Sequence, residues 1–167
     1  MRPTSDKVRE AIFNALEAQR VDMSLVLDLY AGSGALGIEA LSRGAGRCDF
    51  VERDASNAAI IRENLSAPGL EEQGKVHRTT AERAPERLSG PYTVIFADPP
   101  YADDAAVAAL DGVARSSLVD GQTTLVLEHS SRRAAPERLG RLDLAWSRRY
   151  GDTQVSFYRQ RDEGGAA

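Results

Sequence analysis

This sequence contains little cysteine, histidine or lysine, and these shortages exclude several kinds of site. Cys48 is the only cysteine, so neither a disulfide framework nor a cysteine metal cluster can form within the chain. The two histidines and the acidic residues show no metal-ligand spacing, and we expect no metal site. No signal peptide and no apolar run long enough to cross a membrane is visible. We therefore expect a cytoplasmic protein without a membrane partner.

The chain also lacks an excess of positive charge. Its 21 basic and 25 acidic residues give a net charge of −4, which argues against a protein that coats nucleic acid nonspecifically. Lys7 and Lys75 are the only lysines, and arginine side chains suit the geometry of phosphate groups. Residues 130–161 carry eight arginines and three acidic residues. This segment either contacts phosphates or forms an ordinary solvated surface.

What the chain does have is an alternation of apolar segments that predicts one α/β domain. A chain of 167 residues, 42% of them hydrophobic, can bury one core. We expect the domain over residues 1–161, with an N-terminal helix over 4–20, and a disordered tail over 162–167. Strands are predicted at 25–27, 48–51, 75–78, 92–97, 123–128, 141–149 and 153–159, and further helices at 35–41, 54–65 and 103–116. This order is typical of a doubly wound, Rossmann-like, mostly parallel sheet with helices on both faces.

The chain is organised around a glycine-rich turn in residues 26–37, VLDLYAGSGALG. A strand precedes it and a helix follows, so backbone N–H groups and the positive end of a helix dipole can face a ligand. Gly32, Gly34 and Gly37 match the dinucleotide pattern G-x-G-x-x-G, which alone is weak evidence. The charge of Asp28 would repel a pyrophosphate but suits the ammonium group of S-adenosylmethionine. The other interpretation is a tight turn that binds no ligand.

The predicted cofactor site draws residues from the ends of several strands, because ligands of such sheets bind beyond the carboxyl ends. Asp28, Glu52, Ala81 and Asp98 each follow a predicted strand, so they should converge on one edge. Glu52 lies about 20 residues beyond the glycines and can bind ribose hydroxyls, while the segment at Ala81 can contact an adenine edge. The predicted cofactor residues are Asp28, Ala31, Gly32, Ser33, Gly34, Glu52, Arg53, Ala81 and Glu82.

A second motif, Asp98-Pro99-Pro100-Tyr101, follows the predicted strand at 92–97. The prolines stiffen the backbone and lack N–H groups, so the Asp98 carboxylate and the Pro99 carbonyl form a pocket rich in acceptors. Such a pocket suits the exocyclic amine of a base and can orient it for in-line methyl transfer. Tyr101 offers a stacking face worth about 1–3 kcal/mol per base. The plainer interpretation is a turn that ends a strand.

Together these motifs resemble a known family. Residues 26–37 with Glu52 resemble the cofactor site of class I S-adenosylmethionine-dependent methyltransferases, and Asp-Pro-Pro-Tyr resembles their amino-group methylating motif. Residues 2–14, RPTSDKVREAIFN, and 28–44, DLYAGSGALGIEALSRG, are similar to the bacterial RsmD-type family. Members of that family are 16S ribosomal RNA guanine-N2 methyltransferases.

The resemblance implies S-adenosylmethionine as the cofactor and the exocyclic N2 amine of a guanine as the methyl acceptor. It also implies seven strands with the last one antiparallel. We expect a monomer that acts on 16S rRNA within an assembling small ribosomal subunit. The residues with implied catalytic roles are Asp98, Pro99 and Tyr101. The residues expected to contact RNA are Arg2, Arg9, Asn14, Pro100 and Tyr101.

Three other functions remain open from the sequence. Asp-Pro-Pro-Tyr also serves adenine amines, so an adenine-N6 DNA methyltransferase is one alternative, although the 167 residues show no separate target-recognition domain. The glycine pattern alone would also fit an NAD-dependent oxidoreductase. A noncatalytic RNA-binding module is the third, and the presence of both motifs argues against it.

Overall fold

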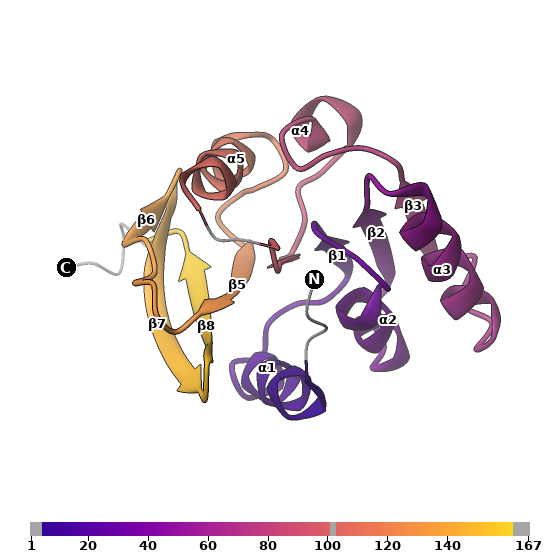
Figure 1. Cartoon of the computed structure of the whole chain (residues 1–167), viewed down its shortest axis with the longest axis horizontal. Coiled ribbons are helices and arrows are strands. Elements are labelled where there is room, and N and C mark those ends of the chain that lie inside the picture. The colour runs from indigo at the N-terminus through magenta and orange to yellow at the C-terminus, as the bar shows by residue number, and fades with distance from the viewer. Residues whose placement is uncertain (1–4, 101–102, 162–167) are drawn as a thin grey trace.

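The computed structural model describes residues 5–100 and 103–161 of the chain (Figure 1). The predicted tail over 162–167 lies outside the described residues. The helices are α1 (Asp6–Ala18), α2 (Ala35–Ser42), α3 (Ala55–Ser66), α4 (Ala84–Arg87) and α5 (Asp104–Arg115). The strands are β1 (Leu25–Asp28), β2 (Arg47–Val51), β3 (Gly74–His77), β4 (Val94–Ala97), β5 (Thr124–Ser130), β6 (Arg138–Leu139), β7 (Leu142–Tyr150) and β8 (Thr153–Arg159).

In the described residues, eight strands form one sheet in the order β3-β2-β1-β4-β5-β8-β7-β6. Strands β1 to β5 pair in parallel, whereas β8 pairs antiparallel with both β5 and β7. The predicted mostly parallel, doubly wound sheet with an antiparallel last strand is confirmed. The predicted number of seven strands is wrong, because the two-residue strand β6 pairs with the start of β7. A strand that short has no alternation of polar and apolar residues from which it could be predicted.

Helices cover both faces of the sheet (Figure 1). Helices α1, α2 and α3 pack on one face, where the rings of Phe13 and Phe96 lie 5.5 Å apart between centroids. Helices α4 and α5 pack on the other face, around Ile95 and Ala97. Neighbouring residues of β4 thus enter different cores, because successive side chains of a strand point to opposite faces. We call these the α1 face and the α5 face.

Helices α3 and α5 both begin at an aspartate that caps the helix. The Asp54 carboxylate accepts a hydrogen bond from the Asn57 N–H at 3.0 Å at the start of α3. The Asp103 carboxylate accepts one from the Ala106 N–H at 2.9 Å at the start of α5. Each cap satisfies a backbone N–H that has no partner within its helix. The caps therefore fix where the loops after β2 and β4 end.

Candidate nucleoside and methyl-acceptor site

The carboxyl ends of β1 to β4 lie along one edge of the sheet, because these strands are parallel. Beyond this edge the described residues enclose a cavity of about 450 Å³. The predicted site residues on its wall are Glu52, Arg53, Ala81, Glu82, Pro99 and Pro100. Residues from the loops after β2, β3 and β4 therefore meet in one place, on the edge where the sequence analysis expects a ligand.

The glycine loop between β1 and α2 has a backbone shape that favours glycine. Gly32 and Gly34 have φ angles of 58° and 84°, in the left-handed region. The Gly34 N–H donates to the Ala31 carbonyl at 2.7 Å, which closes the turn ahead of α2. At Gly37 an added Cβ would lie 2.4 Å from the ring of Phe50, so this glycine lets α2 approach β2. The third glycine of the motif thus serves helix packing.

Glu52 links the glycine loop to the cavity. Its side chain is buried, and its Oε1 accepts a hydrogen bond from the Gly32 N–H at 2.9 Å. Its Oε2 accepts a second one from the Asp54 N–H at 2.9 Å. A carboxylate has about four acceptor positions, so Glu52 can hold two loops and still accept from a ligand hydroxyl. Ser33, also predicted here, is exposed on the same loop, and its carbonyl accepts from the Asn64 side chain.

Asp28 lies behind this loop, at the end of β1. It is buried, and its Oδ2 accepts a hydrogen bond from the Gly37 N–H at 3.0 Å. Burial raises the pKa of Asp28 to about 7, the Gly37 N–H opposes that rise, and the nearby charge of Glu52 adds to it. The Asp28 carboxylate therefore holds the first turn of α2 through the Gly37 N–H. Because its pKa is about 7, this side chain can bind or release a proton near neutral pH.

The Asp98-Pro99-Pro100 segment faces the glycine loop across the same edge. The Leu29 N–H donates to the Phe96 carbonyl at 2.9 Å, which holds the loop after β1 against the end of β4. Pro99 is buried and Pro100 is exposed, and both line the cavity that Glu52 also lines. Asp98 is half-buried at the strand end. The loop after β1 and the proline segment after β4 therefore both lie at the carboxyl edge of the sheet.

The predicted RNA contacts receive less support from the geometry. Arg9 forms an ion pair with Asp6 within α1 at 2.8 Å and another with Glu39 of α2 at 3.5 Å, so its charge is already paired within the protein. Asn14 is exposed on α1. Arg2 and Tyr101, the latter also predicted as catalytic, lie outside the described residues. Contact of these residues with RNA stays a prediction.

Sequence reasoning missed part of the cavity wall, including Tyr30, Asn57, Thr79 and Asp103. Burial, followed by the charges of Glu82 and Asp103, raises the pKa of Tyr30 to about 12, so this hydroxyl stays protonated and can donate. Tyr30 lies two residues after β1 ends at Asp28, a position that could have marked it. Asn57 and Asp103 reach the cavity only through the packing of α3 and α5.

The cavity has the makeup of a nucleoside site. Glu52 supplies carboxylate oxygens for hydroxyl donors, and Leu29, Val51 and Ala81 supply apolar surface for a planar ring. Within residues 5–100 and 103–161, no group of histidine, cysteine and acidic side chains could hold a metal ion. In the same part of the chain, each helix is too short or too polar to cross a membrane.

Comparison with known proteins identifies the family. A family model described as conserved hypothetical protein 95 matches residues 1–159. The "Putative rRNA methyltransferase YlbH" of Bacillus subtilis is 39% identical over 164 residues, which cover 96% of this chain and 88% of that protein. "Ribosomal RNA small subunit methyltransferase D" of Escherichia coli is 38% identical over 101 residues, which cover 60% of this chain and 50% of that protein.

A solved structure of a conserved hypothetical protein from Streptococcus pyogenes has the same fold. It matches with a TM-score of 0.82 at 34% identity, and the match covers 92% of this chain and 95% of the other. The sequence match and the shared fold agree over nearly the whole chain. The chain therefore belongs to the family described as conserved hypothetical protein 95, that of the RsmD-type methyltransferases.

Proposed function

We propose that this chain transfers a methyl group from S-adenosylmethionine to the exocyclic N2 amine of a guanine in the 16S rRNA of the small ribosomal subunit. One observation carries the proposal. Glu52, which we propose binds a cofactor ribose, and Pro99, which we propose binds the amine, line the same cavity. The name of the Escherichia coli relative supports small-subunit rRNA as the substrate class. On this proposal the protein acts in the cytoplasm as a monomer, on an assembling small subunit.

The residues around the cavity fit the proposed cofactor. S-Adenosylmethionine, when bound, supplies a methyl group on a positively charged sulfur. Glu52 would accept hydrogen bonds from the ribose hydroxyls and Ala81 would border the adenine ring, and Arg53 and Glu82 line the same cavity. The glycine loop at 31–34 lies next to this wall through the Gly32–Glu52 hydrogen bond, and Asp28, when ionised, would supply negative charge for the ammonium group from behind the loop.

On the acceptor side, the proposed chemistry belongs to Asp98 and Pro99. The lone pair of the guanine amine is delocalised into the ring, so the amine is a poor nucleophile. The Asp98 carboxylate and the Pro99 carbonyl accept its two N–H groups and hold the nitrogen in line with the methyl donor. The amine nitrogen gains positive charge as the new bond forms, which Asp98 stabilises before the proton leaves to Asp98 or water. Tyr101 is proposed to stack on the base.

Methylation of small ribosomal subunits tests the proposal. Subunits purified from a bacterial strain that lacks the gene are incubated with the protein and S-adenosylmethionine. The RNA is then digested to nucleosides for mass spectrometry, and the modified position is mapped. We expect one N2-methylguanosine per 16S rRNA, and its absence from both mature and immature subunits would contradict the proposal. Duplex DNA is the second substrate, where N6-methyl-2′-deoxyadenosine would favour the alternative enzyme.

A further inference from the structure

An acidic residue that the sequence analysis did not single out lies beside the acceptor motif. Glu128 is the fifth residue of β5 and is only 6% exposed. The parallel pairing of β4 with β5 sets Phe96 opposite Val126 and Ala97 opposite Leu127. The next residues along the two strands are Asp98 and Glu128. Continued by one residue, the register therefore brings the positions of Asp98 and Glu128 to the same level at the carboxyl edge of the sheet.

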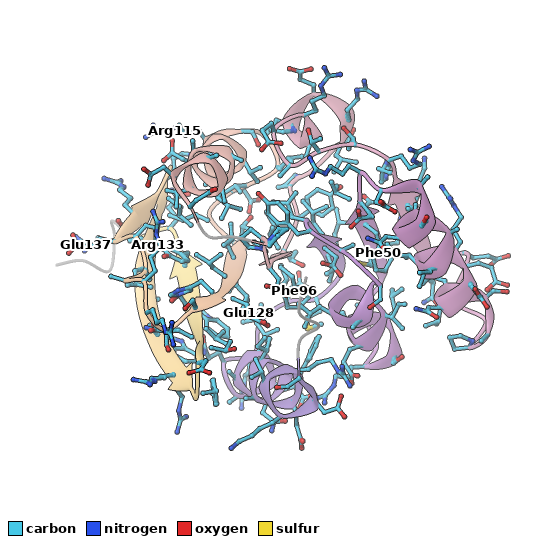
Figure 2. The ribbon with its side chains drawn as sticks, in the orientation of Figure 1. Phe50, Phe96, Arg115, Glu128, Arg133 and Glu137 are labelled. Atoms are coloured by element: carbon cyan, nitrogen blue, oxygen red, sulfur yellow. The ribbon has the colours of Figure 1, made fainter. Side chains whose placement is uncertain are left out.

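Glu128 points to the α1 face, and continuing the alternation of β4 one residue past its end at Ala97 assigns Asp98 to the same face. Phe96 and Val126 belong to the core of the α1 face, and side chains two residues further along a strand return to the same side. An independent observation comes from β8, where Val155 lies directly opposite Glu128 in an antiparallel pair and is buried in that same core. Directly opposite residues share a face. Figure 2 shows Glu128 next to Phe96, on neighbouring strands.

The edge of guanine suits a second acceptor next to the first. Guanine presents its N2 amine and the adjacent N1–H as neighbouring donors, whereas adenine presents its N6 amine next to an N1 lone pair. If Asp98 and Pro99 hold the N2 amine of guanine, a side chain next to these two residues lies opposite N1 of the same base. A carboxylate there accepts a hydrogen bond from guanine and repels the lone pair of adenine.

We propose that Glu128 is a specificity residue, which selects guanine by accepting a hydrogen bond from its N1–H. This inference rests on the proposed function. A carboxylate can accept about four hydrogen bonds, so Glu128 can keep its contacts within the protein and still bind the base. Its place among apolar residues of the α1 face makes the hydrogen bond strong, because little water competes there. The pair of Asp98 and Glu128 thereby distinguishes this site from an adenine site that needs only the first acceptor.

The test replaces the target guanine by 2-aminopurine, which keeps the N2 amine but has a lone pair at N1. 16S rRNA is ligated from segments that carry either base at the position mapped above, and kcat/KM is measured on both. The wild-type protein should favour guanine by about a hundredfold or more. In Glu128→Gln the side-chain amide can donate to the N1 lone pair, so this preference should fall by about tenfold or more.

Glu137→Gln is the matched control, because Glu137 is an exposed acid at the outer edge of the sheet, away from Glu128 (Figure 2). It should keep the wild-type preference. Equal wild-type rates on guanine and 2-aminopurine would overturn the inference even if Glu128→Gln failed to fold. An unchanged preference in a folded Glu128→Gln would overturn it as well, with the proposed function intact. If the wild-type protein methylates no guanine, the proposed function and this inference are both contradicted.

Discussion

The parallel half of the sheet, β3-β2-β1-β4-β5, and its antiparallel end, β8-β7-β6, use polar side chains in different ways. In the parallel half, Asp28 and Glu52 accept hydrogen bonds from backbone N–H groups of the loops at the carboxyl edge. In the antiparallel end, β6, β7 and β8 follow one another through two-residue turns at 140–141 and 151–152. Parallel strands need long crossovers, whose loops gather at one edge. That difference explains why the candidate site belongs to the parallel half.

The arginines of the antiparallel end are partly committed to structure. Arg141 donates to the carbonyls of Ser116 and Val119, each at 2.9 Å, and so fastens β7 to the end of α5. Arg133 pairs with Asp104 at 2.7 Å. The positive charge after residue 130 therefore offers fewer phosphate contacts than a count of arginines indicates. Contact of this segment with RNA phosphates stays a prediction.

The largest expected effect comes from Asp98, in the parallel half. Asp98→Asn keeps the side-chain size but loses the negative charge that stabilises the amine during transfer. We expect kcat to fall by about a thousandfold, and the Kd of S-adenosylmethionine to change by less than about threefold. Single-turnover methylation and calorimetry measure the two quantities. A similar loss of kcat and of affinity for S-adenosylmethionine would contradict a catalytic role for the Asp98 carboxylate.

Glu52 should affect the cofactor instead. Glu52→Gln removes the charge that accepts from the ribose hydroxyls, and a hydrogen bond to a charged group contributes about 1.5–3 kcal/mol. We therefore expect calorimetry to show a Kd for S-adenosylmethionine that is higher by about 10–100-fold. Thermal unfolding without cofactor checks that the Gly32 and Asp54 contacts survive. An unchanged affinity would remove Glu52 from the ribose site.

Asp28 should make the stability of the parallel half depend on pH. Its folded pKa of about 7 lies well above the ordinary value, so the folded state binds more protons between about pH 4 and 7. Wild-type stability contributed by this group is therefore lost as pH rises through that window. In Asp28→Asn we expect the free energy of unfolding, relative to wild type, to increase by about 2 kcal/mol from pH 5 to pH 8. Urea unfolding at both pH values measures it, and a pH-independent difference would contradict the raised pKa.

The smallest effects are expected in the antiparallel end, where Arg141 and Arg148 should differ. Arg141→Ala loses hydrogen bonds to carbonyls of the α5 end, so the free energy of unfolding should fall by about 1 kcal/mol. Arg148 is exposed, and Arg148→Ala should change stability by less than about 0.5 kcal/mol. If Arg148 contacts a phosphate, the slope of log affinity against log salt should fall by about one. If urea unfolding shows the same loss in the free energy of unfolding for Arg141→Ala and Arg148→Ala, the structural role of Arg141 is contradicted.

The sequence could predict those parts of the fold and site that depend on neighbouring residues. The buried strand before Asp98, the cap at Asp54 and the turn at Gly32 each have a local signal: an apolar run, a capping aspartate and a glycine pair. The shared edge followed from the rule that parallel strands end together. Strand β6 and helix α4 were not predicted, because elements of two and four residues are too short to show a period.

By itself the sequence determined which residues stand at strand ends and in which order they follow, because alternation and capping act between residues close in the chain. Only the tertiary structure decided that Tyr30 and Asp103 share a cavity wall with Glu52, and that Glu128 lies level with Asp98. Register is set by hydrogen bonds between strands that are distant in sequence, and a shift of one residue would turn Glu128 to the opposite face. The neighbours of a side chain across the sheet are therefore a property of the folded molecule.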